Sequence, residues 1–221
     1  MKKLLGILFL ATILLMGCVE EDVDTYDSYL QISNWSYSDN LDVSVDYDST
    51  VLYPLEYVTY TIADIEEDDY ENVNVSYSGR FVFDEDYSVQ IDADETYTLD
   101  VFPNCGEIVV ANLSNAFTIT EVYLSPSSDT SWGNDDLAGT IAAGYNVTWK
   151  AEAGYWDIKL VDDYGDEFIA LDNYLGTEST ITYEYTGFRA DKATGDTDAA
   201  KAKNAAKYAG ERFGGRLEIV K

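Results

Sequence analysis

Apolar and polar residues alternate with a period of two along most of this chain, and this pattern constrains its fold more than any other feature. Leu41, Val43 and Val45 alternate with polar residues, as do Val73 and Val75, and similar runs follow. Clusters of Gly, Asn, Asp and Ser separate the runs, with strands about eight to twelve residues apart. Because successive side chains of a strand point to opposite faces, the pattern predicts half-buried strands. We therefore predict an all-β protein with one or two tandem antiparallel β-sandwich domains.

The composition separates this acidic chain from a disordered one. Its formal net charge is −29, with 42 Asp and Glu against 13 Lys and Arg. Disordered acidic segments have few aromatic residues, whereas this chain has 19 Tyr, 8 Phe and 4 Trp, which favour strands. Phosphate contacts need Lys and Arg, so we expect no nucleic-acid partner.

The amino-terminal segment predicts export. Lys2 and Lys3 precede an apolar run over residues 4–16, which is the layout of a secretory signal. The run is shorter than the roughly twenty residues of a membrane-spanning helix. It ends in Leu15-Met16-Gly17-Cys18, which resembles the lipobox of bacterial lipoproteins. The resemblance implies that residues 1–17 are removed and that Cys18 receives a diacylglycerol and acyl chains. The alternative is an ordinary signal with a chance Cys.

An anchor of this kind would place the protein on a membrane surface. Several acyl chains give stable attachment, while the acidic body is repelled by anionic headgroups and stands off in water. Residues 18–28 are then an acidic tether. Val19 rather than Asp follows Cys18. In enteric lipoproteins an Asp there marks retention at the inner membrane, so we favour the outer membrane if the cell has two.

Two halves of the chain resemble each other. Asn34 and Ser36 align with Asn112 and Ser114, and residues 70–75 align with 155–160. In the same order, residues 81–83 align with 168–170 and residues 95–99 with 179–183. This predicts an internal duplication, with β-sandwich repeats at 29–103 and 106–187. The alternative is that any two all-β stretches with alternating aromatic residues align loosely.

The second half contains an ordered string of motifs. They are Asn112-x-Ser114, Ser125-Pro126-Ser127, Trp132-Gly133 and Tyr155-Trp156-Asp157-Ile158. In this order they resemble a β-sandwich module of uncharacterised secreted and lipid-anchored bacterial proteins. The resemblance implies a fold and export, and no particular activity. The first half lacks the Ser-Pro-Ser and Trp-Gly motifs.

Residues 188–221 form a tail of different composition, rich in Ala and Lys. Asp196 or Asp198 is a candidate N-cap for a helix from residue 199 to about residue 213, which Gly214-Gly215 would end. Its apolar face would be mostly Ala, so we predict a marginal helix or a disordered tail. Its cations would lie against the acidic body, an attraction that salt would weaken.

The residue types exclude several catalytic centres. There is no His, and there are 2 Cys, so the chain lacks a Ser-His-Asp arrangement and a disulfide framework. If Cys18 is acylated, the chain has no other Cys that could form a disulfide with Cys105. We favour a buried thiol there over a bond to another molecule.

Carboxylates offer two weak calcium sites. One is residues 64–69, and the other is Asp162, Asp163 and Asp166, because carboxylate oxygens suit calcium. The second segment lacks the spacing and closing Glu of an EF-hand. We favour a solvated loop for the first and a polar hairpin turn with Gly165 at a positive φ for the second.

Two tryptophans are candidates for contact with a ligand. Trp132 and Trp156 could stack on a sugar ring, although sandwich cores commonly contain such residues. We therefore expect a non-catalytic, lipid-anchored envelope protein that binds a polysaccharide or another envelope protein, with no cofactor beyond the covalent lipid. A calcium-dependent adhesin or carbohydrate-binding protein is the first alternative. A carboxylate-dependent glycosidase is the second, although nothing in the sequence singles out two carboxylates.

Overall fold

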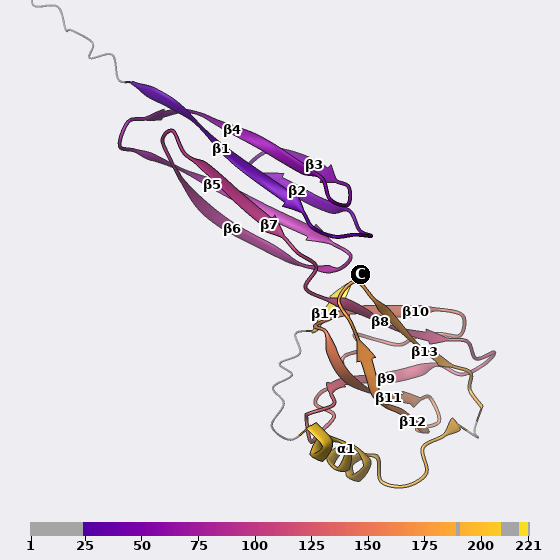
Figure 1. Cartoon of the computed structure of the whole chain (residues 1–221). Helices are drawn as coiled ribbons and strands as arrows, with labels where there is room; N and C mark the ends of the chain where they lie inside the picture. Colours follow the sequence, from indigo (N-terminus) through magenta and orange to yellow (C-terminus); the bar gives the residue numbers. More distant parts are fainter. Residues whose placement is uncertain (1–23, 189–190, 209–216, 221) are drawn as a thin grey trace, which may run out of the picture.

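The computed structural model describes residues 24–188, 191–208 and 217–220, and these ranges are mostly strands (Figure 1). The predicted all-β class is confirmed. The predicted lipid attachment at Cys18 lies outside the described residues. No helix among the described residues is long and apolar enough to span a membrane.

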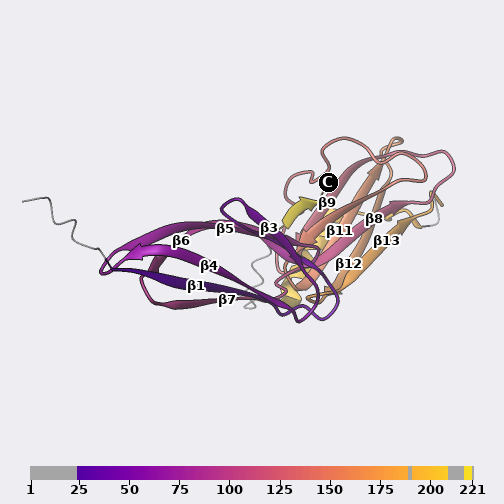
Figure 2. The same cartoon turned by 90° about the horizontal axis from the view of Figure 1, so that it is seen from above.

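The first unit packs two sheets face to face. One sheet has the order β4-β1-β7, with β1 at Thr25–Asn34, β4 at Tyr57–Glu66 and β7 at Thr96–Val101. The other has the order β3-β2-β5-β6, with β2 at Leu41–Val45, β3 at Asp48–Leu52, β5 at Tyr70–Gly79 and β6 at Val82–Asp92. The two layers lie on opposite sides of the unit in Figure 2. Leu30, Ile32 and Val75 are among the residues buried between them.

The second unit repeats this architecture. One sheet has the order β13-β8-β10-β14, with β8 at Gly106–Asn112, β10 at Asn146–Ala151, β13 at Thr180–Tyr185 and β14 at Leu217–Val220. The other has the order β12-β11-β9, with β9 at Ile119–Pro126, β11 at Gly154–Asp162 and β12 at Glu167–Leu175. Ile108, Trp149 and Ile158 are among its core residues.

The two units share one topology. β1 and β8 are matching central strands, each antiparallel to one neighbour (β4 or β10) and parallel to the other (β7 or β13). The orders β2-β5-β6 and β9-β11-β12 also correspond, while β3 and β14 have no counterpart. The sequence segments that align between the halves lie on matching strands. Duplication as their origin stays a prediction.

A buried Asn closes the same corner in each unit. Asn112 donates from its side chain to the carbonyls of Phe117 and Ile141, at 2.9 and 2.8 Å, and accepts from the backbone of Ser114 at 3.1 Å. Asn34 donates to the carbonyl of Leu52 at 3.0 Å and accepts from the backbone of Ser36 at 2.9 Å. The Asn-x-Ser motif is therefore a structural device that satisfies backbone groups where the chain leaves a central strand.

Side-chain contacts join the two units across the linker at residues 102–105. Arg80 binds Glu107 through its Nε and Nη2 atoms at 2.9 and 2.5 Å, and Nη2 also donates to Thr180 at 3.1 Å. The hydroxyl of Ser36 binds the carboxylate of Glu178. Cys105 is buried at this junction.

The tail departs from its prediction in three ways. Helix α1 spans Thr197–Ala205, with Asp196 as its N-cap, and a 3-10 turn follows at Ala206–Tyr208. Its buried residues are Thr197, Lys201, Asn204 and Ala205 rather than mostly alanines. Strand β14, which no alternation predicted, pairs with β10. Likewise, residues 25–28, expected in the tether, belong to β1. The proposed helix end at Gly214-Gly215 lies outside the described residues.

Candidate functional site

The two tryptophans considered for ligand contact are buried. Trp132 is 4% exposed and donates from its indole nitrogen to the carbonyl of Thr197 at 3.3 Å. Trp156 is 2% exposed and donates to the carbonyl of Glu152 at 3.0 Å. Neither ring presents a face to solvent, so burial favours core packing over the possible stacking on a sugar ring. Their apolar area instead stabilises the second unit.

The three aspartates considered for calcium organise a turn. One oxygen of Asp162 accepts from the backbone of Tyr164 and Asp166, both at 2.9 Å, and Gly165 in the turn has φ 76°. The other oxygen accepts from the hydroxyl of Tyr185 at 2.9 Å. Burial and this bond raise the pKa of Tyr185.

The remaining carboxylates of that turn do not converge on Asp162. Asp166 forms an ion pair with Lys192, and Asp163 is exposed. Residues 64–69 form the end of β4 and the turn that leads to β5, and Asp64 and Asp68 adopt positive φ there. In the described parts of the chain, no three Asp, Glu, His or Cys residues are grouped so that they could hold a metal ion.

A different surface stands out on the first unit, on the outer face of the β4-β1-β7 sheet. The pairing register arranges nine side chains in three rows across the strands. The rows are Thr61–Tyr29–Thr96, Thr59–Gln31–Thr98 and Tyr57–Ser33–Asp100. We call these nine residues the neutral face, because Asp100 is the only charged residue among them. The four threonines are exposed, while Leu30 and Ile32 alternate with these positions and fill the core.

Aromatic rings lie within the neutral face and next to it. Tyr29 and Tyr57 are 41% and 66% exposed. Beyond the last row, Trp35 and Phe102 stack with their ring centroids 5.8 Å apart and an interplanar angle of 9°. The indole nitrogen of Trp35 donates to Asp100 at 2.8 Å, so the single carboxylate of the face also orients this ring pair. Exposed, pre-oriented aromatic rings beside hydroxyl groups provide both apolar and hydrogen-bonding contacts.

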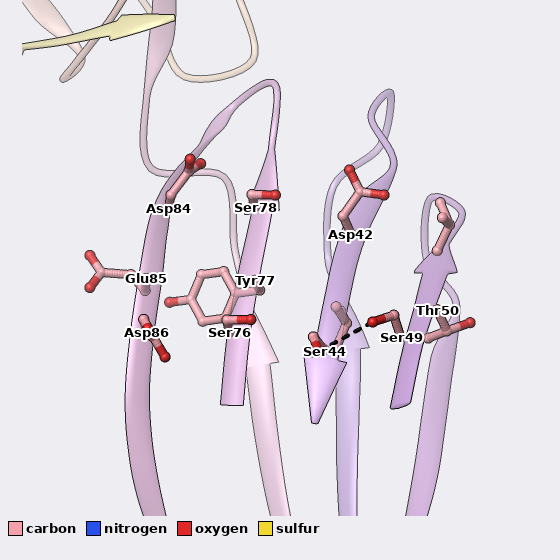
Figure 3. A pocket seen from close by; sticks show the side chains of 12 residues that line it. Asp42, Ser44, Ser49, Thr50, Ser76, Tyr77, Ser78, Asp84, Glu85 and Asp86 are labelled. Carbon is pink, nitrogen blue, oxygen red and sulfur yellow. Dashed lines mark hydrogen bonds between the residues drawn. The ribbon is translucent and has the colours of Figure 1, made fainter. Parts of the chain in front are cut away.

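The opposite face of the same unit is acidic. A hollow of about 480 Å³ lies over strands β3, β2, β5 and β6, and side chains that line it are drawn in Figure 3. Its lining includes Asp42, Asp84 and Asp86 beside serines such as Ser44 and Ser49, whose hydroxyls are 3.3 Å apart. Its carboxylates would repel anionic ligands. It is the second candidate surface, and its lining does not include an exposed ring pair like the one beside the neutral face.

The sequence patterns did not predict the neutral face, and the reason is geometric. Its threonines occupy the polar positions of alternating strands, at Thr59 and Thr61 and again at Thr96 and Thr98. They meet only because β7 pairs parallel to β1, which lies some seventy residues earlier in the chain. Threonine at alternate positions beside Tyr57 was the available signal, but no local pattern gives the order of strands in a sheet.

Comparisons with known proteins add little. No family model matches the chain, and no curated protein matches it. Among solved structures, the Bacillus anthracis TIE protein is similar over 73% of this chain at 10% sequence identity, with a TM-score of 0.30. The chain spans 34% of that protein's length. A likeness this distant carries no inference about function.

Proposed function

We propose that this protein is an exported, lipid-anchored, non-catalytic binding protein whose neutral face binds an uncharged polysaccharide of the cell envelope. The observation that carries the proposal is the contrast between the net charge of −29 and the single carboxylate among the nine residues of that face. That carboxylate, Asp100, already accepts a hydrogen bond from Trp35.

The chemistry of the face suits a sugar chain. Threonine hydroxyls and the amide of Gln31 donate and accept hydrogen bonds, as sugar hydroxyls require. Tyr29, Tyr57 and the Trp35–Phe102 pair offer apolar ring surfaces to the C–H faces of a pyranose. Covering uncharged polar groups with matching partners costs less desolvation than covering carboxylates. Adjacent strands are about 4.8 Å apart, so three strands make a platform about 10 Å wide.

The anchor and the face belong together in this proposal. Strand β1 begins at Thr25, seven residues after Cys18. Seven residues span at most about 25 Å, so an acylated Cys18 holds the first unit near the membrane surface. Figure 1 shows the second unit at the far end of the first, away from the start of β1. Calcium-dependent binding stays an untested prediction from the sequence. The placement of the aspartates does not favour it.

Retention on polysaccharide particles tests the binding proposal. The chain without its signal, residues 19–221, is mixed with cellulose or chitin. Replacing Tyr57→Ala removes a ring of the neutral face, and Tyr47→Ala removes a fully exposed ring from the β2–β3 turn as a matched control. We expect Tyr57→Ala to weaken retention about tenfold, equivalent to about 1.4 kcal/mol, and Tyr47→Ala to leave it unchanged. Absence of retention on either polymer, or equal losses in both variants, would overturn the proposal.

Metabolic labelling tests the anchor separately. Cells that make the full chain are fed radioactive palmitate, and the Cys18→Ser variant serves as the control. We expect label on the wild-type protein and none on the variant, since only a thiol forms the thioether. An unlabelled wild-type protein would remove the anchor from the proposal and leave polysaccharide binding to be judged by itself.

A further inference from the structure

Three of the four motifs of the second unit converge beneath helix α1. Ser127 ends the Ser-Pro-Ser motif after β9, Trp132 lies in the connection that follows, and Asp157 is on β11. Ser127 and Asp157 are both 0% exposed. The tail supplies Lys201, which is also 0% exposed, so a cation and an anion are enclosed together.

The ammonium group of Lys201 is held by three kinds of group. Its Nζ lies 2.9 Å from Oδ2 of Asp157 and donates to the carbonyl of Pro126 at 2.6 Å. It also lies 5.6 Å from the ring centroid of Trp132. A carboxylate, a carbonyl and an aromatic ring together offer charge, hydrogen-bond acceptors and a cation–π contact, which is the chemistry that recognises a primary ammonium.

The body of the unit orients this carboxylate without the helix. Oδ1 of Asp157 accepts from the hydroxyl of Ser127 at 2.6 Å and from the backbone of Asp172 at 2.9 Å. From α1, Asn204 adds contacts of 3.0 Å to both carboxylate oxygens, while its own buried Oδ1 has no hydrogen-bond partner among the described residues. The helix therefore contributes a ligand to a site that strands β9 and β11 and their loops already form.

A second cation lies near the same ring but belongs to another pair. Lys159 is 5.5 Å from the Trp132 centroid and 4.2 Å from that of Tyr123, and its nearest carboxylate is Glu167 at 3.7 Å. The charge of Asp157 is thus offset by Lys201. An unpaired carboxylate buried here would be strongly unfavourable.

We propose that Asp157, Ser127, Trp132 and the Pro126 carbonyl form a binding site for a primary ammonium group, which Lys201 occupies in cis. The ligand class is an alkylammonium, such as the side chain of a lysine. This site lies on the second unit and is independent of the neutral face. Docking of α1 is then the binding of one lysine by a preformed anionic site, and the same site accepts another primary amine when Lys201 is absent.

Chemical rescue tests the site. Lys201→Ala is made in the chain of residues 19–221, and Lys203→Ala, an exposed change on the same helix, is the control. We expect Lys201→Ala to lower the melting temperature and n-butylammonium to restore a substantial part of the loss. Neither n-butanol nor tetramethylammonium at the same concentration should restore it, and Lys203→Ala should respond to none of the three. Equal rescue by n-butanol, equal rescue by tetramethylammonium, or no rescue would overturn the proposal.

A second measurement covers a variant that does not fold unaided. Lys201→Ala is then diluted from denaturant with and without n-butylammonium, and folding is followed by Trp fluorescence. Folding that requires the amine supports the site, whereas failure in both conditions contradicts it. Adding Asp157→Asn to the variant should abolish any rescue, because the carboxylate is the group that selects a cation.

Discussion

Lys150 of the second unit donates a hydrogen bond of 2.9 Å to the backbone carbonyl of Val82 in the first unit. The same ammonium lies 2.8 Å from Asp84, and Lys150 is 5% exposed. Between Cys18 and Arg189 the cations are Arg80, Lys150 and Lys159. Two of these three bind one unit to the other, so scarce positive charge is concentrated where an acidic two-unit chain would otherwise repel itself.

Replacing Lys150→Met should loosen this junction while keeping most of the side-chain volume. The change leaves the Val82 carbonyl without its charged donor, so we expect a loss of about 2 kcal/mol in the free energy of unfolding. Lys192→Met, which removes an ion pair between an exposed lysine and Asp166, is the control and should cost less than about 1 kcal/mol. Denaturant unfolding measures both. Equal stability of Lys150→Met and the wild type would count against a structural junction.

Acid should weaken the junction. Burial alone would raise the pKa of Glu107, but hydrogen bonds from Arg80 and Thr180 and the charge of Arg80 lower it below its ordinary value of 4.5. The pKa of Glu178 is lowered in a similar way, because hydrogen bonds from Ser36 and the backbone of Tyr37 outweigh burial. A lowered folded-state pKa gives stability that is present above the unfolded pKa and lost as pH falls through the folded one.

The resulting pH profile can be measured. From these two groups we expect no change in melting temperature between pH 7 and about pH 5.5, and a fall that begins near pH 4.5. Glu107→Gln should make the fall shallower, since it removes one of the two titrating groups. A profile that is flat down to pH 3, or the same slope in Glu107→Gln, would show that these carboxylates do not stabilise the junction.

The shared topology predicts matching effects at the two Asn corners. Asn112→Ala and Asn34→Ala each remove buried side-chain hydrogen bonds, and they leave the backbone N–H of Ser114 or Ser36 without its Asn acceptor. We therefore expect each change to lower the free energy of unfolding by about 1–3 kcal/mol. Asn115→Ala and Asn40→Ala, which change exposed residues nearby, should have effects below about 0.5 kcal/mol. A large loss at one corner and none at the other would argue against equivalent roles.

Gly106 is fixed by the close approach of two backbone segments. A Cβ at this position would lie 2.4 Å from the carbonyl oxygen of Gly176 and 2.8 Å from that of Ser179. Gly106→Ala should therefore destabilise the second unit by about 1–3 kcal/mol. Gly176→Ala is the matched control, because the nearest atom to its Cβ is the Ser179 hydroxyl at 3.4 Å. Comparable melting temperatures for the two variants would contradict this contact.

Local patterns predicted the strands but could not predict their neighbours. Alternation at Leu41, Val43 and Val45 identifies β2, and the cap at Asp196 begins α1 as expected. Alternation does not give the direction or the order of strands in a sheet. The parallel pairing of β7 with β1 and the resulting neutral face were therefore not predicted. Helix α1 was expected to bury alanines because Ala supplies most of its apolar residues. Nothing in its sequence indicates that Lys201 pairs with Asp157, which lies in a strand forty-four residues before it.

Backbone chemical shifts of the isotope-labelled chain, residues 19–221, would locate a bound oligosaccharide on the surface of the first unit. The chain is titrated with cellohexaose and with chitohexaose, and the perturbed amides are located. We predict shifts at Gln31, Thr59 and Thr98 of the neutral face, with no change at Ser44 and Ser76 in the acidic hollow. Perturbation confined to the hollow, or no perturbation at millimolar oligosaccharide, would contradict this prediction.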